Sequence, residues 1–588
     1  MMTTTTSYHS YGMVTMRSLP LLLAVFVCLL PSTLLSCHAF SAAAAAAPGG
    51  PVSLPPPAMG GGKTMADHLP LAKKAMEYFD ESTDPFLAVQ TSIEMLKLAG
   101  YEDLDNGGTI TSYSSIRPGG KYYYTRNKST LVAFCVGGQY KPTVAEDNSS
   151  NGGGGFVVIG GHTDSPNLRV KPRSRRGSGK PTKGTPIQIG AECYGGGLWH
   201  TWFDRDLGIS GRVFVRNDDG TIQQRLIKID RAVLRIPNLA IHLITAKERE
   251  AFKINKEDHL SPILAMAVQK GLEGNNNDEE KTKSDGDDDD CDASKSKKDD
   301  DDDEDDDDDD DGWTEFQEPL LLQLLSHEMD VPVDKIVDFE LSMFDIQKAN
   351  LGGVHSEFVF SARLDNLASC FLAVEGLVQC TDDDDFVKNS KDISMVVLYD
   401  HEEVGSSSAV GAASPILGEA VKRISSSLYS QDTSSSSNDL APYDLYETVA
   451  SKSFVLSSDQ AHALHPNYAS KHEKNHQPQM NGGMVIKRNA NQRYATTGAT
   501  GVLMREIARR ASLPPVQEFI VRQDCGCGST IGPLISTSTG IRAIDMGCPQ
   551  LSMHSIREQM GTADLTNGLN LFKAYFQTFR EVDDSLEQ

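Results

Sequence analysis

The chain has 588 residues, of which 81 are acidic and 55 basic, and its formal net charge at pH 7 is −26. Residues 275–312 alone hold 22 acidic and 5 basic side chains, a net of −17, so the rest of the chain carries −9. This balance argues against binding to nucleic acid, whose phosphates require basic surfaces, while the length allows several domains.

The N-terminal residues 1–62 are expected to be a targeting presequence. Arg17 precedes a leucine-rich run, and an alanine tract follows Phe40, which is typical of a signal peptide. Pro20 and Pro31 bracket a run too short to span a bilayer comfortably, so we expect no stable membrane span in the mature protein. The junction at Phe40 resembles the presequences of complex-plastid algae. We therefore expect entry into the secretory pathway and delivery to a plastid, with the vacuole or secretion as alternatives.

Four continuous apolar runs indicate strands that are buried on both faces, as in a parallel sheet. They occupy residues 156–164, 393–403, 453–460 and 541–547. Helical patterns alternate with them at 364–380, 497–511 and 563–579. This alternation predicts an α/β fold, a three-layer domain with a mostly parallel sheet built from residues 63–165 and 345–588.

Residues 166–344 show a different pattern of short apolar segments and turns, including a hairpin signal at Asp218–Gly220. We predict a β-rich domain inserted into the first one. Its acidic run, 275–312, is expected to be a disordered surface loop, with a calcium buffer or a partner-binding tail as alternatives. Serine-rich residues 425–439 predict a second polar loop.

Polar residues follow the apolar runs at the carboxyl ends of strands, where functional groups gather in such sheets. His162 and Asp164 are two residues apart, so on an extended chain they share one face. Asp164 could then accept the imidazole N–H of His162 and fix its tautomer. The alternative is an ordinary turn. Asp459 follows the third run in the same way.

Glu402 and Glu403 are adjacent, and neighbours on an extended chain point in opposite directions. One could bind a cation while the other stays free, and spacing allows either assignment. Asp365 begins a helical stretch, where an N-cap is the alternative role. His554 taken alone is equally compatible with a structural histidine.

The segment His472–His476 has the spacing HExxH, which binds zinc when it lies on a helix. Pro478 and a glycine pair follow closely, and the segment has no apolar stripe. We expect no helix there and hence no zinc site of that type.

Seven segments, in this order, resemble the aspartyl aminopeptidase family over residues 66–582, outside the presequence and the acidic run. They are GGHTDSPNLRVKP, ECYGGGLWHTWFDRDL, SARLDN, DHEEVGSSSAVGA, SSDQAHALHPNY, NGGMVIKRNANQRYATTGATG and CGSTIGP with DMGCPQLSMHSIRE.

The resemblance implies a catalytic α/β domain with an inserted β-rich oligomerisation domain and two zinc ions in each subunit, other divalent ions being possible. It implies that Asp365 bridges the ions and that Glu402 is the general base, with Asp164 as partner of the first ligand histidine. The remaining ligands would be His162 and Asp459 on one ion, and Glu403 and His554 on the other.

The resemblance also implies an aminopeptidase that removes N-terminal Asp or Glu from peptides and assembles as a homododecamer. For the substrate side chain we predict Lys487 as the binding cation, with Arg488 as the next choice. Tyr494 and His462 are expected nearby, and His242 is expected to reach the active site of a neighbouring subunit. The alternatives are a broader zinc aminopeptidase, a carboxypeptidase, a deacylase or, least favoured, a non-enzymatic acidic scaffold.

Overall fold

The computed structural model describes residues 64–105, 113–142, 153–176, 184–267, 312–432 and 443–586. The expected presequence 1–62 lies outside these ranges, as does the expected acidic loop 275–312 except for its last residue. Within the described ranges, no helix combines the length and the apolar character that crossing a bilayer requires.

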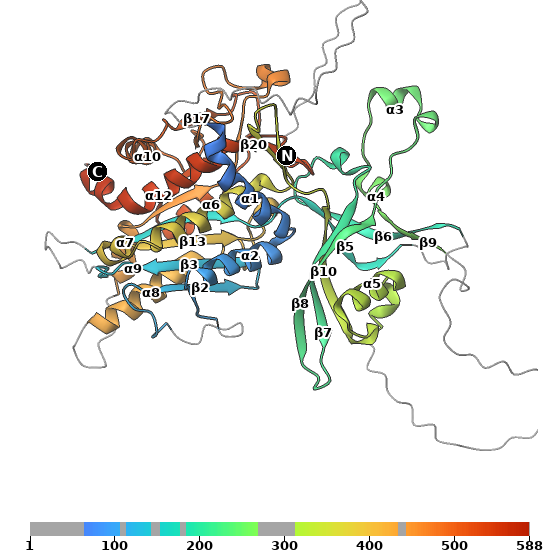
Figure 1. The fold of residues 1–588 in the computed structure, drawn as a ribbon, viewed down its shortest axis with the longest axis horizontal. Helices are drawn as coiled ribbons and strands as arrows, with labels where there is room; N and C mark the ends of the chain where they lie inside the picture. Colours follow the sequence, from blue (N-terminus) through green and yellow to red (C-terminus); the bar gives the residue numbers. More distant parts are fainter. Residues whose placement is uncertain are drawn as a thin grey trace, which may run out of the picture. The chain divides into compact units, whose positions relative to one another are not determined.

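A nine-stranded mixed sheet has the strand order β1-β2-β3-β13-β4-β14-β18-β16-β17 (Figure 1). Its inner strands β13, β4, β14 and β18 run parallel, and they are the four runs predicted from the sequence. The strands are β1 (Glu102–Asp103), β2 (Lys121–Arg126), β3 (Thr130–Val136), β4 (Phe156–His162), β13 (Ile393–Tyr399), β14 (Phe454–Ser458), β16 (Val485–Arg488), β17 (Gln517–Ile520) and β18 (Arg542–Gly547).

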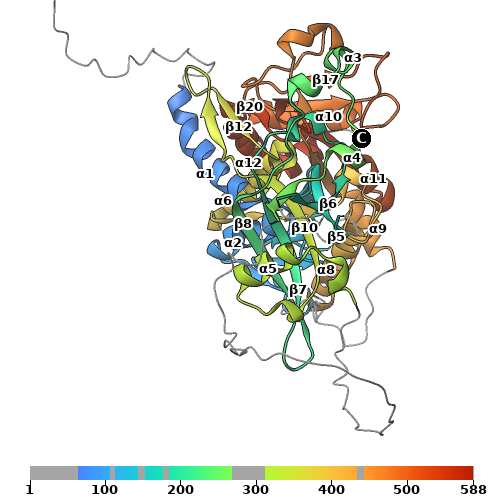
Figure 2. The ribbon, with the colours of Figure 1, turned by 90° about the vertical axis from the view of Figure 1, so that its right-hand side faces the viewer.

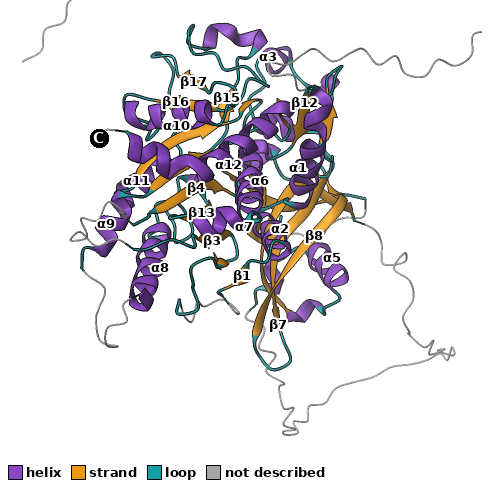
Figure 3. Cartoon of the chain, turned by 60° about the vertical axis from the view of Figure 1, so that its left-hand side comes forward, coloured by secondary structure: helices purple, strands orange, loops and turns teal. Residues whose placement is uncertain are grey.

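Each face of this sheet is covered by helices, drawn purple in Figure 3. Val157 and Ile159 of β4 enter one core while Phe156 and Val158 enter the other, which explains why the run is apolar throughout. The first core is completed by α1 (Leu69–Glu81), α2 (Pro85–Leu98), α6 (Leu364–Thr381), α7 (Asp384–Asn389), α10 (Gly498–Arg510) and α12 (Thr562–Ser585). The second is completed by α8 (Ile416–Asp432), α9 (Leu445–Ser451) and α11 (Ile531–Thr539). The predicted three-layer α/β class is confirmed.

A second sheet of six antiparallel strands, ordered β8-β7-β10-β5-β6-β9, is formed between Asn167 and Asp345 (Figure 2). The predicted hairpin at Asp218–Gly220 connects β7 to β8. The elements are β5 (Asn167–Arg175), β6 (Pro186–Tyr194), β7 (Leu207–Arg216), β8 (Ile222–Leu234), α3 (Ala246–Glu250), α4 (Lys256–His259), β9 (Ile263–Met266), α5 (Pro319–Met329) and β10 (Ile336–Asp345). Leu321 and Leu325 of α5 contribute to its core.

A third sheet, of five strands, was not anticipated from the sequence. Its order is β11-β12-β20-β19-β15, and the turn between β19 and β20 contains His554. The strands are β11 (Asn350–Gly352), β12 (Phe358–Ser361), β15 (Ala461–His462), β19 (Pro549–Leu551) and β20 (Glu558–Gly561). These strands are two to four residues long, too short to show a periodic pattern.

The predicted serine-rich loop is wrong in its first part, because α8 continues to Asp432. Val421, Ile424 and Leu428 recur at helical spacing and are buried against the sheet. The hydroxyl of Ser427 is satisfied by donating to the Tyr113 carbonyl at 2.6 Å. Tertiary packing of this apolar stripe therefore outweighs the polar composition.

Candidate active site

Three neighbouring strands deliver side chains to one edge of the nine-stranded sheet. His162 ends β4 and pairs in register with Tyr399, the last residue of β13. Asp459 directly follows β14, which runs parallel to β4 on its other side. Parallel strands bring their carboxyl ends together, so these side chains meet although they are far apart in the sequence.

The resulting cavity has a volume of about 520 Å³. It contains most of the residues predicted for the site: Asp365, Glu402, Glu403, Asp459, His462, Lys487, Tyr494 and His554. His162 lies behind this surface and is fully buried. His242 does not line the cavity of its own subunit; it is exposed on a short 3-10 helix, Ile241–Leu243, of the inserted segment.

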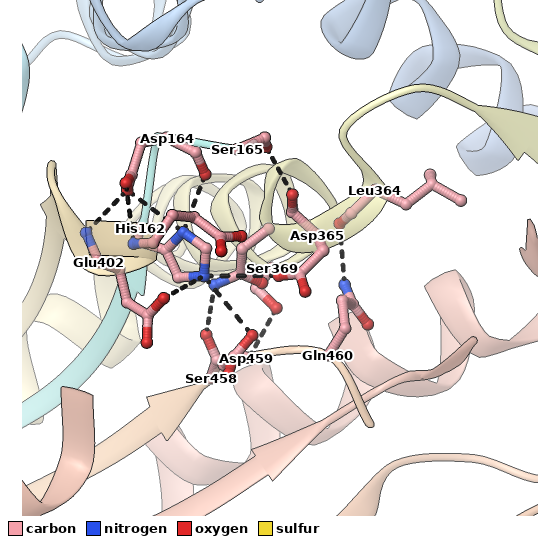
Figure 4. A network of polar contacts seen from close by, with 12 residues as sticks. His162, Asp164, Ser165, Leu364, Asp365, Ser369, Glu402, Ser458, Asp459 and Gln460 are labelled. Carbon is pink, nitrogen blue, oxygen red and sulfur yellow. Dashed lines mark hydrogen bonds and ion pairs between the residues drawn. The ribbon is translucent and has the colours of Figure 1, made fainter. Parts of the chain in front are cut away.

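Two ligand groups share Asp365. In the first, the Nε2 atom of His162 lies 3.4 Å from Asp365 Oδ1 and 3.5 Å from Asp459 Oδ1 (Figure 4). In the second, the Nε2 atom of His554 lies 3.6 Å from Asp365 Oδ2 and 3.4 Å from Glu403 Oε2. The two oxygens of Asp365 thus face different groups, which is the arrangement of a bridging carboxylate.

These groups fit a pair of divalent cations. Asp365 Oδ1 and Glu403 Oε1 are buried, and neither has a hydrogen-bond partner among the described residues. Burial raises the pKa of Asp365 and of Glu403, and the repulsion of neighbouring carboxylates is the second cause. A positive ion at each group would remove both costs, and imidazole and carboxylate are ligands of zinc.

Glu402 lies beside the first group, with its Oε2 atom 3.9 Å from His162 Nε2. Burial raises its pKa to about 8. His162, Glu402 and Glu403 form a further set with ligand spacing, so the distances allow Glu402 to serve either as a ligand or as a base.

The prediction that the two glutamates lie on an extended chain is wrong. They begin a 3-10 helix, Glu402–Val404, after His401 adopts a left-handed conformation with φ 63°. The carboxylate of Asp164 accepts the N–H groups of Glu402 at 3.1 Å and Glu403 at 3.0 Å. Paired acceptance of two successive N–H groups favours a turn over a strand here and holds both glutamates by their backbone.

The expected contact from Asp164 to His162 is present in a weaker form. Nδ1 of His162 lies 3.4 Å from the Asp164 carboxylate and only 3.0 Å from its backbone carbonyl. A carbonyl can only accept, so Nδ1 carries the proton and Nε2 is left to face the carboxylates. This is the tautomer that a metal ligand needs. The backbone carbonyl of Asp164 is closer to Nδ1 than its carboxylate is, so the carbonyl makes the stronger contact.

Asp365 lies at the start of α6, as predicted, but it does not cap the helix. Arg363 occupies the N-cap position, and both Asp365 and Asn366 have non-helical backbone angles across a cis peptide bond. The carboxylate of Asp365 is turned into the site instead. Its backbone N–H donates to Glu558 Oε2 at 2.9 Å.

Glu558 is a site residue that the sequence reasoning missed. It is buried at the start of β20, and its other oxygen accepts the N–H of His554 at 2.7 Å. One carboxylate thus fixes the backbones of a ligand from each group. Burial, and then the nearby Asp365, raises its pKa well above the ordinary value.

Two cationic side chains also line the cavity. Lys487 on β16 is buried, with Nζ 3.1 Å from Asp459 Oδ2 and 5.6 Å from the centre of the Tyr494 ring. Arg493, which was not predicted, also lines the cavity and has no ion pair with any described residue. Arg488, the alternative to Lys487, does not line this cavity and lies 3.5 Å from Glu518.

The HExxH segment forms no helix, as predicted. His472 ends a 3-10 helix, Pro466–Lys471, and the next residues form turns. His476 contacts Glu473 at 2.5 Å, and His472 accepts the N–H of His465 at 3.1 Å. Each histidine therefore has a local structural contact.

Comparisons with known proteins agree with this geometry. Residues 78–576 match the family described as aminopeptidase I zinc metalloprotease (M18). The chain is 43% identical over 517 residues to the aspartyl aminopeptidase of Aspergillus oryzae, which covers 87% of this chain and 96% of that relative. Among solved structures it is similar to a chain in the cryo-EM structure of the Ape4 and Nbr1 complex, with 37% identity, a TM-score of 0.74 and coverage of 90% and 89%. It is also similar to the S. cerevisiae mApe1 dodecamer, with 27% identity, a TM-score of 0.68 and coverage of 88% and 99%.

Proposed function

The chain belongs to the aminopeptidase I zinc metalloprotease (M18) family, and we propose that it is a two-zinc aminopeptidase that removes N-terminal Asp or Glu from peptides. The observation that carries the proposal is the pair of ligand groups sharing Asp365, with Glu402 beside them and two cationic side chains in the same cavity. The names of curated relatives, aspartyl aminopeptidases from a fungus and from Dictyostelium discoideum, support the same substrate class.

Five residues would hold the ions. His162, Asp365 and Asp459 would hold one, and Asp365, Glu403 and His554 the other. When bound, such ions would lower the pKa of a coordinated water molecule and polarise the scissile carbonyl.

Glu402 is suited to move the proton. Its carboxylate lies at the edge of the first group and is outside the two ligand sets that share Asp365. A base of this kind takes a proton from the attacking water and returns it to the leaving amine. Asp164 holds the Glu402 backbone, which keeps the carboxylate in place between the two transfers.

Lys487 and Arg493 would select the acidic side chain of the substrate. Lys487 forms an ion pair with Asp459. Burial opposes ionisation of the Asp459 carboxyl group, but the ammonium group of Lys487 holds the pKa of Asp459 below the ordinary range. Arg493 has no such partner in the described structure, so its guanidinium is free for a carboxylate.

Arg493→Gln should lower the preference for Asp over Leu substrates by about 10-fold or more. Arg488→Gln, outside the cavity, is the matched control and should leave the preference unchanged.

The test of the proposed function is metal analysis combined with a substrate panel. The purified protein should contain two zinc ions per subunit and release N-terminal Asp and Glu much faster than Leu. It should not cleave N-acetyl-Asp peptides, since a free amine is needed. An equal rate for Leu peptides would indicate a broader aminopeptidase. Cleavage of acetylated peptides would indicate a carboxypeptidase or a deacylase. A purified protein that holds no metal and has no activity would indicate a non-enzymatic scaffold.

We further propose that the chain assembles as a homododecamer through the inserted segment 166–344. The similarity to the mApe1 dodecamer supports an oligomer. The exposed position of His242, beside exposed Ile241 and Leu243, is compatible with its proposed approach to a neighbouring active site. Light scattering of the purified protein would test the assembly, and His242→Ala would test whether activity is lost while the oligomer persists.

The compartment is also a proposal. Residues 1–62 have the composition of a signal peptide followed by a possible plastid transit segment. A fluorescent fusion of these residues should enter the secretory pathway and reach the plastid. Fluorescence in the vacuole or in the medium would select one of the alternatives instead.

A further inference from the structure

One segment of the inserted β-rich region reaches the active site. β6 ends at Tyr194, and the chain then passes through three glycines to the 3-10 helix Trp199–Trp202. We call residues 194–201 the bridging segment. It lies between the six-stranded sheet and the turn that carries His554.

The first contact is made by Tyr194. Its hydroxyl donates to Asp164 Oδ2 at 2.7 Å, and this carboxylate also holds the N–H groups of Glu402 and Glu403. The ring of Tyr194 is fixed in turn by the guanidinium of Arg169, 3.7 Å from its centre. A side chain of the inserted sheet therefore supports the backbone of both glutamates through Asp164.

The second contact is made by the backbone of the glycines. Nδ1 of His554 donates to the Gly196 carbonyl at 3.1 Å, which leaves Nε2 to face Asp365 and Glu403. The Leu198 N–H donates to the His554 carbonyl at 2.8 Å, and the Ile556 N–H donates to the Thr201 hydroxyl at 3.0 Å. Three hydrogen bonds thus tie this segment to the turn of His554.

Gly195 fits closely against the same group. Its φ is +73°, and an added Cβ would lie 3.2 Å from the Cβ of Glu403. Gly220 offers a comparison inside the same inserted region, since it has φ +83° but no atom within 4 Å of an added Cβ. Alanine would strain the backbone at both positions but would press on a ligand only at Gly195.

We propose that the bridging segment is a positioning element for the second metal group, Glu403 and His554, so that the inserted region sets the affinity of that metal. The first group has no such contact from this segment except through Asp164. The inference rests on the proposed two-metal function. Hydrogen bonds that orient a ligand histidine typically change metal affinity by about 10- to 100-fold, so loss of the support should be measurable.

The test compares Gly195→Ala with Gly220→Ala in the full-length chain. Zinc is titrated into the metal-free proteins in competition with a chromophoric chelator. In Gly195→Ala we expect one of the two zinc affinities to fall by about 10-fold or more, with the other within twofold of the wild type. Its activity should be recovered by excess zinc, which a misfolded protein would not show. Gly220→Ala should bind both ions as the wild type does.

Equal zinc affinities in the two variants would overturn the proposal, as would equal weakening of both ions in Gly195→Ala. A wild-type protein that binds a single ion would instead refute the two-metal function on which the proposal rests, so the two failures are distinguishable.

A second variant, Tyr194→Phe, removes one hydroxyl and keeps the ring against Arg169. At saturating zinc we expect kcat to fall by about 10-fold while KM changes less than twofold, because Asp164 then holds Glu402 less firmly. An unchanged kcat would remove Tyr194 from the positioning element.

Discussion

The two metal groups share Asp365 but are built on different kinds of backbone. His162 and Asp459 sit at the ends of adjacent parallel strands, and the side chain of His162 is 1% exposed. Glu403 lies in a single 3-10 turn between two residues with positive φ, His401 and Gly405. His554 itself has positive φ, and its side chain is 32% exposed. The first group is held by the sheet itself. The second depends on hydrogen bonds from Asp164, Glu558 and the bridging segment.

Two ligand groups that share one carboxylate can therefore be supported in different ways. A rigid group can rely on strand register, whereas a group on turns needs partners from elsewhere in the chain. The positions of Glu403 and His554 can then depend on contacts from the inserted region, such as the Gly196 carbonyl.

The largest expected effect belongs to Glu402, which lies beside the first group. Glu402→Gln should lower kcat by about 10²- to 10⁴-fold, because the amide cannot accept a proton from water. Zinc content should stay at two ions per subunit. Metal analysis and turnover of an Asp peptide provide the measurement, and loss of one ion together with activity would make Glu402 a ligand.

Next in size is the difference between the two ligand histidines. His162→Ala should destabilise the metal-free protein by about 3 kcal/mol, since it takes the nearest imidazole from the buried Asp365, while Asp459 keeps Lys487. His554→Ala should cost about 1 kcal/mol or less, because its side chain is partly in solvent. Urea unfolding of both metal-free variants checks this, and equal losses would contradict the contrast between the groups.

A smaller effect is expected at Glu558, which contacts both groups. Glu558→Gln replaces one of the two acceptor oxygens by an amide donor, which disturbs the shared support of Asp365 and His554. We expect zinc affinity to fall by about 10-fold, with both ions affected, in contrast to Gly195→Ala. Chelator competition is the measurement, and a change confined to one ion would assign Glu558 to that group alone.

The smallest effect is expected outside both groups. His472→Ala removes an acceptor for the His465 N–H but touches none of the proposed ligands. Activity should stay within about twofold of the wild type, as is usual for a surface substitution away from special features. A variant that lost its zinc would restore the HExxH segment as a candidate metal site.

The strands and their polar ends could be predicted because the signal is local. A continuous apolar run predicts a strand buried on both faces, and His162, Asp459 and the paired glutamates follow such runs directly. The ligand set itself came from the family resemblance, since the spacing left Glu402 and Glu403 interchangeable.

The supporting residues could not be found in the same way because their partners are remote. Asp365 and Glu558 are 193 positions apart, and Gly196 and His554 are 358 positions apart. No periodicity links such pairs. The 3-10 turn at Glu402 was also missed, because the Asp164 carboxylate that stabilises it lies more than 200 residues earlier.

The contact from Gly196 to His554 is made by a main-chain carbonyl, so exchanging the side chain at position 196 leaves the acceptor atom in the chain. What the site requires of this stretch is a fixed contour length. Deleting or adding one residue between Tyr194 and Trp199 would move the acceptor by roughly 3.5 Å along the chain, farther than a hydrogen bond can stretch. Engineering that shortens or lengthens this glycine run should therefore disable the second metal group even where point substitutions are tolerated.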